Sequence, residues 1–184
     1  MTGAEQAAGA LVLMPNALDF GAPEPGDLRA SLPLPVLQRA AAIRHWVVED
    51  AKSARAFLGR VAMVTPLAAP IQALDIRELP RPPKGSSSTF EPDDACLQTL
   101  LAPARQGGVV GLLSEAGLPA VADPGAALVR AAHAVGLRVE ALPGPTALML
   151  ALAASGLNGQ HFAFVGYLPV PADDRAWRIR ERDA

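Results

Sequence analysis

Two acidic residues of this sequence stand where a short apolar segment ends, and a carboxylate held at such a position could accept a proton. Glu49 closes the apolar segment Trp46–Glu49, and Glu115 follows the apolar segment Val109–Ser114. Positioned carboxylates are common general bases. Glu49 has a simpler alternative, as a charge at the start of a helix or as a partner for Arg55. We take Glu49 and Glu115 as the candidate catalytic residues.

Three of the apolar segments are followed at once by a loop that is rich in glycine or proline. These loops begin after Met14, after Ser114 and after Leu142. In an open parallel sheet, ligands bind beyond the carboxyl ends of the strands, and glycine lets the backbone approach a ligand closely. Any single loop of this kind could be an ordinary turn. None matches a dinucleotide or P-loop pattern, so an uncharged or zwitterionic ligand fits better than a phosphate.

The elements that must position these residues alternate between strand-like and helix-like segments. This alternation predicts an α/β fold with an open, mostly parallel five-stranded sheet flanked by helices, followed by the start of a second α/β domain. We expect residues 1–159 to form the first domain and residues 160–184 to begin a second, truncated one. The expected strands are 9–15, 46–49, 71–80, 109–114, 137–143 and 162–168, and the expected helices are 34–45, 50–60, 93–107, 123–135 and 145–155.

Composition excludes several classes of protein. Of the 184 residues, 51% are hydrophobic and 18% are charged, which favours a folded globular chain. The longest apolar run, Thr146–Leu157, is too short to cross a bilayer, and no signal peptide is evident, so we expect a cytoplasmic protein without membrane contact. The single cysteine, Cys96, excludes an intrachain disulfide, and the three histidines lack a metal-binding spacing. We therefore expect no metal site.

The same loops carry a resemblance to a known family. The segments Leu112–Gly125, Leu142–Leu157 and Phe162–Pro169 together resemble the tetrapyrrole (corrin/porphyrin) methylase superfamily, in particular its ribosomal RNA small-subunit methyltransferase I-like branch. Leu11–Pro15 and Val47–Leu58 are similar to the first strand and the acidic segment of that family. The resemblance implies a two-domain α/β fold, a homodimer and S-adenosylmethionine as the cofactor.

The resemblance also implies a function and a set of binding residues. The function would be methyl transfer from S-adenosylmethionine, with the ribose 2′ hydroxyl of ribosomal RNA as a candidate acceptor. Two alternatives stay open: a truncated, non-catalytic remnant with weak or no cofactor binding, and a methylase of a small tetrapyrrole-like metabolite. The net charge of −2 offers no strong attraction for nucleic acid. The residues that the resemblance assigns to the cofactor are Pro15, Gly117, Leu118, Val121, Thr146 and Ala147.

Overall fold

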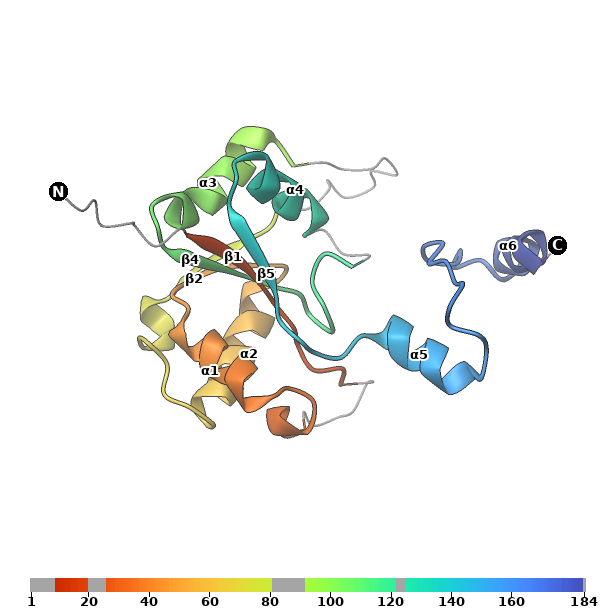
Figure 1. Cartoon of the computed structure of the whole chain (residues 1–184), viewed down its shortest axis with the longest axis horizontal. Helices are drawn as coiled ribbons and strands as arrows, with labels where there is room; N and C mark the ends of the chain where they lie inside the picture. The colour runs from red at the N-terminus through yellow and green to blue at the C-terminus, as the bar shows by residue number, and fades with distance from the viewer. Residues whose placement is uncertain (1–8, 20–25, 81–91, 122–124, 184) are drawn as a thin grey trace. The chain divides into compact units, whose positions relative to one another are not determined.

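The computed structural model describes residues 9–19, 26–80, 92–121 and 125–183. The chain divides into two compact units, Met1–Ala147 and Leu148–Ala184, each of which is described by itself below. The first unit is a layered α/β structure with helices on both faces of a sheet (Figure 1). The boundary expected between residues 159 and 160 stays a prediction.

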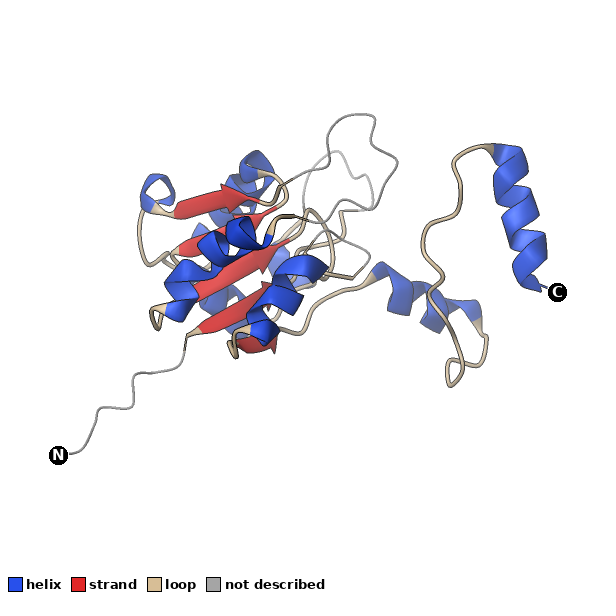
Figure 2. Ribbon diagram, turned by 90° about the horizontal axis from the view of Figure 1, so that it is seen from above, coloured by secondary structure: helices blue, strands red, loops and turns tan. Residues whose placement is uncertain are grey.

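The sheet of the first unit is open and entirely parallel, as predicted. Its strands lie in the order β3–β2–β4–β1–β5, and Figure 2 shows their arrows pointing the same way. β1 and β4 are continuously apolar, as expected for strands that helices cover on both faces. The strands are β1 (Ala10–Met14), β2 (His45–Val48), β3 (Asp75–Glu78), β4 (Val109–Leu113) and β5 (Arg138–Ala141).

Two pairs of helices bury the opposite faces of this sheet. Successive strand residues point to opposite sides, so Val12 packs with Phe57 on the face covered by α1 and α2, while Leu11 packs with Leu101 and Leu128 on the face covered by α3 and α4. This pairing of helices with faces is visible in Figure 1. The bounds are α1 (Leu34–Ala42), α2 (Ala51–Ala62), α3 (Asp94–Arg105) and α4 (Ala126–Ala134).

Two of the expected strands differ from the structure. The segment 71–80 begins with a short 3₁₀ helix, Ile71–Ala73, and only Asp75–Glu78 pairs as β3. The strand expected at 162–168 is wrong: this segment pairs with no strand in the described part of the chain, and Gly166 has a φ of 87°, which interrupts an extended backbone. The predicted helix start at Asp123 lies outside the described residues.

The second unit contains two helices, α5 (Ala147–Ser155), whose first residue belongs to the first unit, and α6 (Ala172–Asp183). α5 has no buried residue, and Met149 and Leu150 are each about half exposed. Among the helices that the structure describes, none has both the length and the hydropathy needed to cross a membrane.

The centre of the sheet is packed tightly enough for one methyl group to matter. Gly111 lies opposite Trp46 in the pairing of β4 with β2, and a Cβ on Gly111 would come within 2.7 Å of the indole ring. The ring is buried and its Nε1 donates to the carbonyl of Ile43 at 3.2 Å, so it cannot move freely. We expect Gly111→Ala to lower the free energy of unfolding by about 1–3 kcal/mol in urea denaturation.

The matched control for this substitution is Gly59→Ala in α2. A Cβ at Gly59 would meet nothing within 4 Å, and alanine favours a helix, so this variant should keep or raise stability by up to about 1 kcal/mol. Equal stability losses in the two variants would contradict the packing argument.

An ion pair at the amino end of the sheet predicts a pH dependence of stability. The guanidinium of Arg77 hydrogen-bonds Asp75 at 3.0 Å and, with a smaller contribution from His45, holds the pKa of the Asp75 carboxyl below its ordinary value. A carboxyl with a lowered folded pKa stabilises the fold above its unfolded pKa of about 3.9, and this contribution is lost as the pH falls through the folded pKa.

Urea denaturation of the wild type and Asp75→Asn between pH 7 and pH 2 measures this contribution. The wild type should exceed the variant by no more than about 1 kcal/mol at pH 7, because the side chains of Arg77 and Asp75 are 44% and 35% exposed, and the difference should vanish in acid. A difference that stays constant with pH would show that the carboxylate charge is not its source.

Candidate functional site at the carboxyl edge of the sheet

The ends of β1 and β4 form the point where the connections of the sheet change direction. β1 and β4 are neighbours, and the chain leaves β1 toward α1 on one face but leaves β4 toward α4 on the other. Parallel sheets bind ligands in the crevice beyond the carboxyl ends at such a switch point. The loops after Met14 and Ser114 emerge here, and the loop after Leu142 leaves β5, the other neighbour of β1.

These three loops are in contact with one another. The N–H of Asn16 donates to the carbonyl of Gly117 at 2.8 Å, and the N–H of Gly117 donates back at 3.2 Å. Gly144 lies so close to Pro15 that a Cβ on it would overlap the proline ring, and a Cβ on Gly117 would lie 3.5 Å from the carbonyl of Pro145. Close backbone approach therefore requires glycine at position 144, whereas the contact at Gly117 is an ordinary one.

The residues assigned to ligand binding by resemblance are uncharged and lie in these loops, except for Ala147, which is the first residue of α5. Both polar backbone groups of Gly117 pair with Asn16, so in this conformation its N–H is not available to a ligand. Accessible surface comes instead from the residues around it. Pro15 and Gly117 are buried, Leu118 and Thr146 are half-buried, and Val121 and Ala147 are exposed.

The loop after β4 has an unusual backbone. Gly117 has a φ of 68°, and Ala120 has a φ of 65°. Ala120 is the one residue other than glycine with a positive φ among those described, and an L-residue in that region costs roughly 1–2 kcal/mol. Strain of this kind persists only where the surroundings enforce it, and it often marks a functional site.

The two candidate catalytic carboxylates come together at the same edge. Glu49 follows β2, Glu115 follows β4, and both line one small crevice between the ends of these neighbouring strands. The hydroxyl of Ser53 donates to Oε1 of Glu115 at 3.4 Å. The crevice has no room for a water molecule, so any reacting group must meet the carboxylates from outside it. Glu115 is exposed and Glu49 is half-buried.

Two more carboxylates of this edge hold the start of α2. Asp50 accepts the N–H of Ser53 at 2.7 Å as the N-cap, and Glu78 at the end of β3 accepts the N–H of Ala51 at 2.8 Å. Both satisfy donors that a helix start leaves unpaired. Their roles are structural, which leaves Glu115 as the accessible acid of the group.

Two residues that shape this edge of the sheet, Asn16 and Glu78, were missed in the sequence. Asn16 looked like an ordinary loop residue, and only its burial reveals that it connects two loops. Glu78 lies inside a segment expected to be strand, and its position at the strand end was the available signal.

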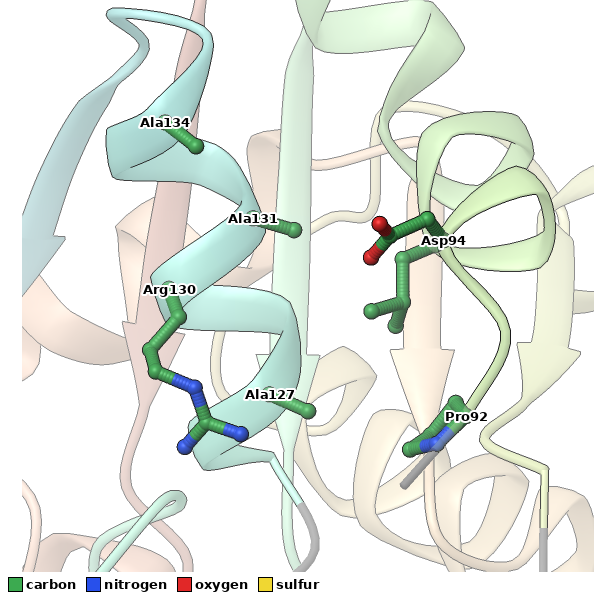
Figure 3. Close-up of a pocket in the computed structure, with 7 residues that line it drawn as sticks. Pro92, Asp94, Ala127, Arg130, Ala131 and Ala134 are labelled. Atoms are coloured by element: carbon green, nitrogen blue, oxygen red, sulfur yellow. The ribbon is translucent and has the colours of Figure 1, made fainter.

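A separate groove lies between α3 and α4. Figure 3 shows Asp94 and Arg130 on its two walls, with a row of alanines along α4. Its volume is about 190 Å³, and it includes none of the residues assigned to the candidate site. Its lining residues are Pro92, Asp94, Leu97, Ala127, Arg130, Ala131 and Ala134.

A metal site requires several His, Cys, Asp or Glu side chains that converge on one point. Within residues 9–19, 26–80, 92–121 and 125–183, no three His, Cys, Asp or Glu side chains gather in a way that could hold a metal ion.

Comparison with known proteins places most of this chain in one family model. Residues 35–181 match the model for Tetrapyrrole (Corrin/Porphyrin) Methylases. The chain is also similar to proteins named Ribosomal RNA small subunit methyltransferase I. The one from Xylella fastidiosa is 41% identical over 87 residues, which cover 47% of this chain and 32% of the relative. The one from Pseudomonas aeruginosa is 49% identical over 76 residues, covering 41% and 27%.

A third such protein, from Escherichia coli O157:H7, is 44% identical over 87 residues, which cover 47% of this chain and 30% of the relative. The matched segments thus span less than a third of the length of each of these three relatives.

The substitution of Gly117 by alanine tests how rigidly the loop after β4 holds its backbone conformation. We expect Gly117→Ala to lower the free energy of unfolding by about 1–2 kcal/mol, because alanine must take a φ of 68° there. The matched control is Gly136→Ala after α4, where φ is 70° and a Cβ meets nothing within 4 Å. Urea denaturation should give similar losses of unfolding free energy for the two variants. A much smaller loss at Gly117 would show that this loop relaxes freely.

Proposed function

The chain belongs to the tetrapyrrole (corrin/porphyrin) methylases, and we propose that it binds S-adenosylmethionine at the carboxyl edge of its sheet and takes part in methyl transfer to ribosomal RNA. The observation that carries this proposal is the meeting of three glycine- and proline-rich loops at the switch point of the sheet. The family match supports methyl transfer as the chemistry.

The residues around these loops suit this cofactor. None of the six proposed binding residues has an ionisable side chain, which fits a ligand recognised mainly by its adenosine. Leu118 and Val121 offer apolar surface for an adenine ring, and the half-buried Thr146 offers a hydroxyl. Pro15, Gly117 and Ala147 would complete the lining. S-adenosylmethionine, when bound, supplies an electrophilic methyl group on a sulfonium.

The contribution of the chain to the reaction would be orientation and proton acceptance. Holding an acceptor in line with the methyl group removes much of the barrier of such a transfer. If the acceptor is a ribose 2′ hydroxyl, its proton must leave as the oxygen–carbon bond forms. Glu115 is the accessible carboxylate of this edge and would take that proton, with Glu49 beside it as the second candidate.

Ribosomal RNA is the proposed acceptor because the relatives carry that substrate in their names. An acceptor of this kind implies a cytoplasmic protein, and the resemblance of the sequence implies a homodimer. The second candidate acceptor is a small tetrapyrrole-like metabolite, which the description of the matched family favours. The two acceptors differ in charge and therefore in the salt dependence of binding.

Calorimetric titration of the 184-residue chain with S-adenosylmethionine and S-adenosylhomocysteine tests the cofactor. We expect saturable binding that Gly117→Ala weakens at least tenfold, or by about 1.4 kcal/mol, because an alanine at a φ of 68° would distort the binding loop. Gly136→Ala carries similar backbone strain outside the proposed site and should bind like the wild type. A folded chain that produces no binding heat would contradict the proposal and favour a non-catalytic remnant.

RNA binding by the cofactor-loaded chain separates the two acceptors. A complex with small-subunit ribosomal RNA should weaken linearly on a log–log plot as the salt concentration rises, because released counterions drive such binding. A chain that binds the cofactor but shows no salt-dependent RNA association would point to the metabolite acceptor.

A further inference from the structure

The side chain of Asn16 makes three hydrogen bonds, all of them to backbone groups. Its Nδ2 donates to the carbonyl of Ser114 at 3.2 Å and to that of Glu115 at 2.9 Å, and its Oδ1 accepts the N–H of Ala17 at 2.8 Å. The residue is only 7% exposed. With the two backbone bonds to Gly117, four hydrogen bonds therefore connect Asn16 to the loop after β4.

The loop that Asn16 holds is the one with the strained backbone. Its positive φ values occur at Gly117, which Asn16 bonds directly, and at Ala120, three residues later. The start of this loop also has a local bond from the Ser114 hydroxyl to the carbonyl of Ala116 at 3.1 Å and a longer one from the Ser53 hydroxyl to the Glu115 carboxylate at 3.4 Å. Since such strain needs enforcement from outside the loop, the contacts from the end of β1 are well placed to supply it.

We propose that Asn16 is a positioning residue that holds the loop of residues 114–121 in its strained conformation and so shapes the cofactor site. Asn16 is buried and acts through the loop, without touching the cofactor itself. The effect on cofactor affinity rests on the proposed function, whereas the hold on the loop does not.

The chemistry of this position requires an amide. The side chain meets two carbonyl oxygens on one side and an N–H on the other, so it must present donors and an acceptor at once. Aspartate has the same shape, but it would place an oxygen against the carbonyls of Ser114 and Glu115. Serine could satisfy one of these carbonyls, and alanine neither. The hold on the loop should therefore decrease from asparagine through serine to alanine, with aspartate also weak.

Amide hydrogen exchange of the ligand-free, 184-residue chain measures this hold directly. We expect protection of the N–H of Gly117 and its neighbours to fall about tenfold or more in Asn16→Ala and Asn16→Asp, and less in Asn16→Ser. The control is Val61→Ala, which removes buried core volume in the last turn of α2, away from these contacts. Unchanged protection of the loop relative to β1 and β4 would overturn the proposal.

A double-mutant cycle tests whether Asn16 enforces the strain at Ala120. Ala120→Gly should raise the midpoint of urea unfolding of the wild type, since glycine adopts a φ of 65° freely. In the Asn16→Ser background the loop is held less firmly, so the same substitution should raise the midpoint by half as much or less. Equal gains in both backgrounds would show that Asn16 and Ala120 are independent, which contradicts the proposal.

Titration with S-adenosylhomocysteine tests whether the contacts of Asn16 with the loop affect ligand affinity at the proposed site. Asn16→Ser should bind about tenfold more weakly than the wild type, whereas Val61→Ala should keep wild-type affinity despite its lower stability. Equal affinities of Asn16→Ser and the wild type would overturn the role of Asn16 in the site. If the wild type itself does not bind, the proposed function fails, and the exchange and cycle experiments still decide whether Asn16 holds the loop.

Discussion

The parallel pairing of β1 with β4 is the contact on which the rest of the first unit depends. It joins segments about a hundred residues apart, from Ala10 opposite Val109 to Met14 opposite Leu113. Because the helices that follow these strands cover opposite faces, this pairing creates the switch point and gives each face its own core. It also brings Asn16 next to Gly117, so the candidate site is a direct continuation of the centre of the sheet.

The candidate site is shaped by the backbone more than by charged side chains. Close approach at Gly144, positive φ at Gly117 and Ala120, and a buried amide at Asn16 all restrict where the loops can lie. A site restricted before binding loses less conformational entropy when its ligand arrives. The cost is local strain, which the paired and buried strands beside the loops can support.

The acidic character of the same edge sets a condition on an RNA acceptor. Glu49, Asp50, Glu78 and Glu115 all stand at the ends of β2, β3 and β4, where they would repel phosphate groups. The arginines of α6 are partly engaged, since Arg178 pairs with Glu181 at 2.6 Å. An RNA substrate therefore requires cationic groups beyond this edge, while a carboxylate within it is suited to accepting a proton.

The sequence by itself determined the fold class and which loops lie at the carboxyl edge of the sheet. The apolar runs of β1 and β4 are uniform enough to predict central parallel strands, and the glycines and prolines behind them mark the carboxyl edge. It also placed Glu49 and Glu115 at strand ends. It failed at residues 162–168, because the apolar pattern there does not reveal the positive φ of Gly166.

Only the tertiary structure decided which of these residues meet. Burial of Asn16, the strain at Ala120 and the contact of Gly144 with Pro15 depend on strands that are distant in the chain. Local propensity carries no information about such partners, since an asparagine after a strand is an ordinary turn residue until a second loop is packed against it.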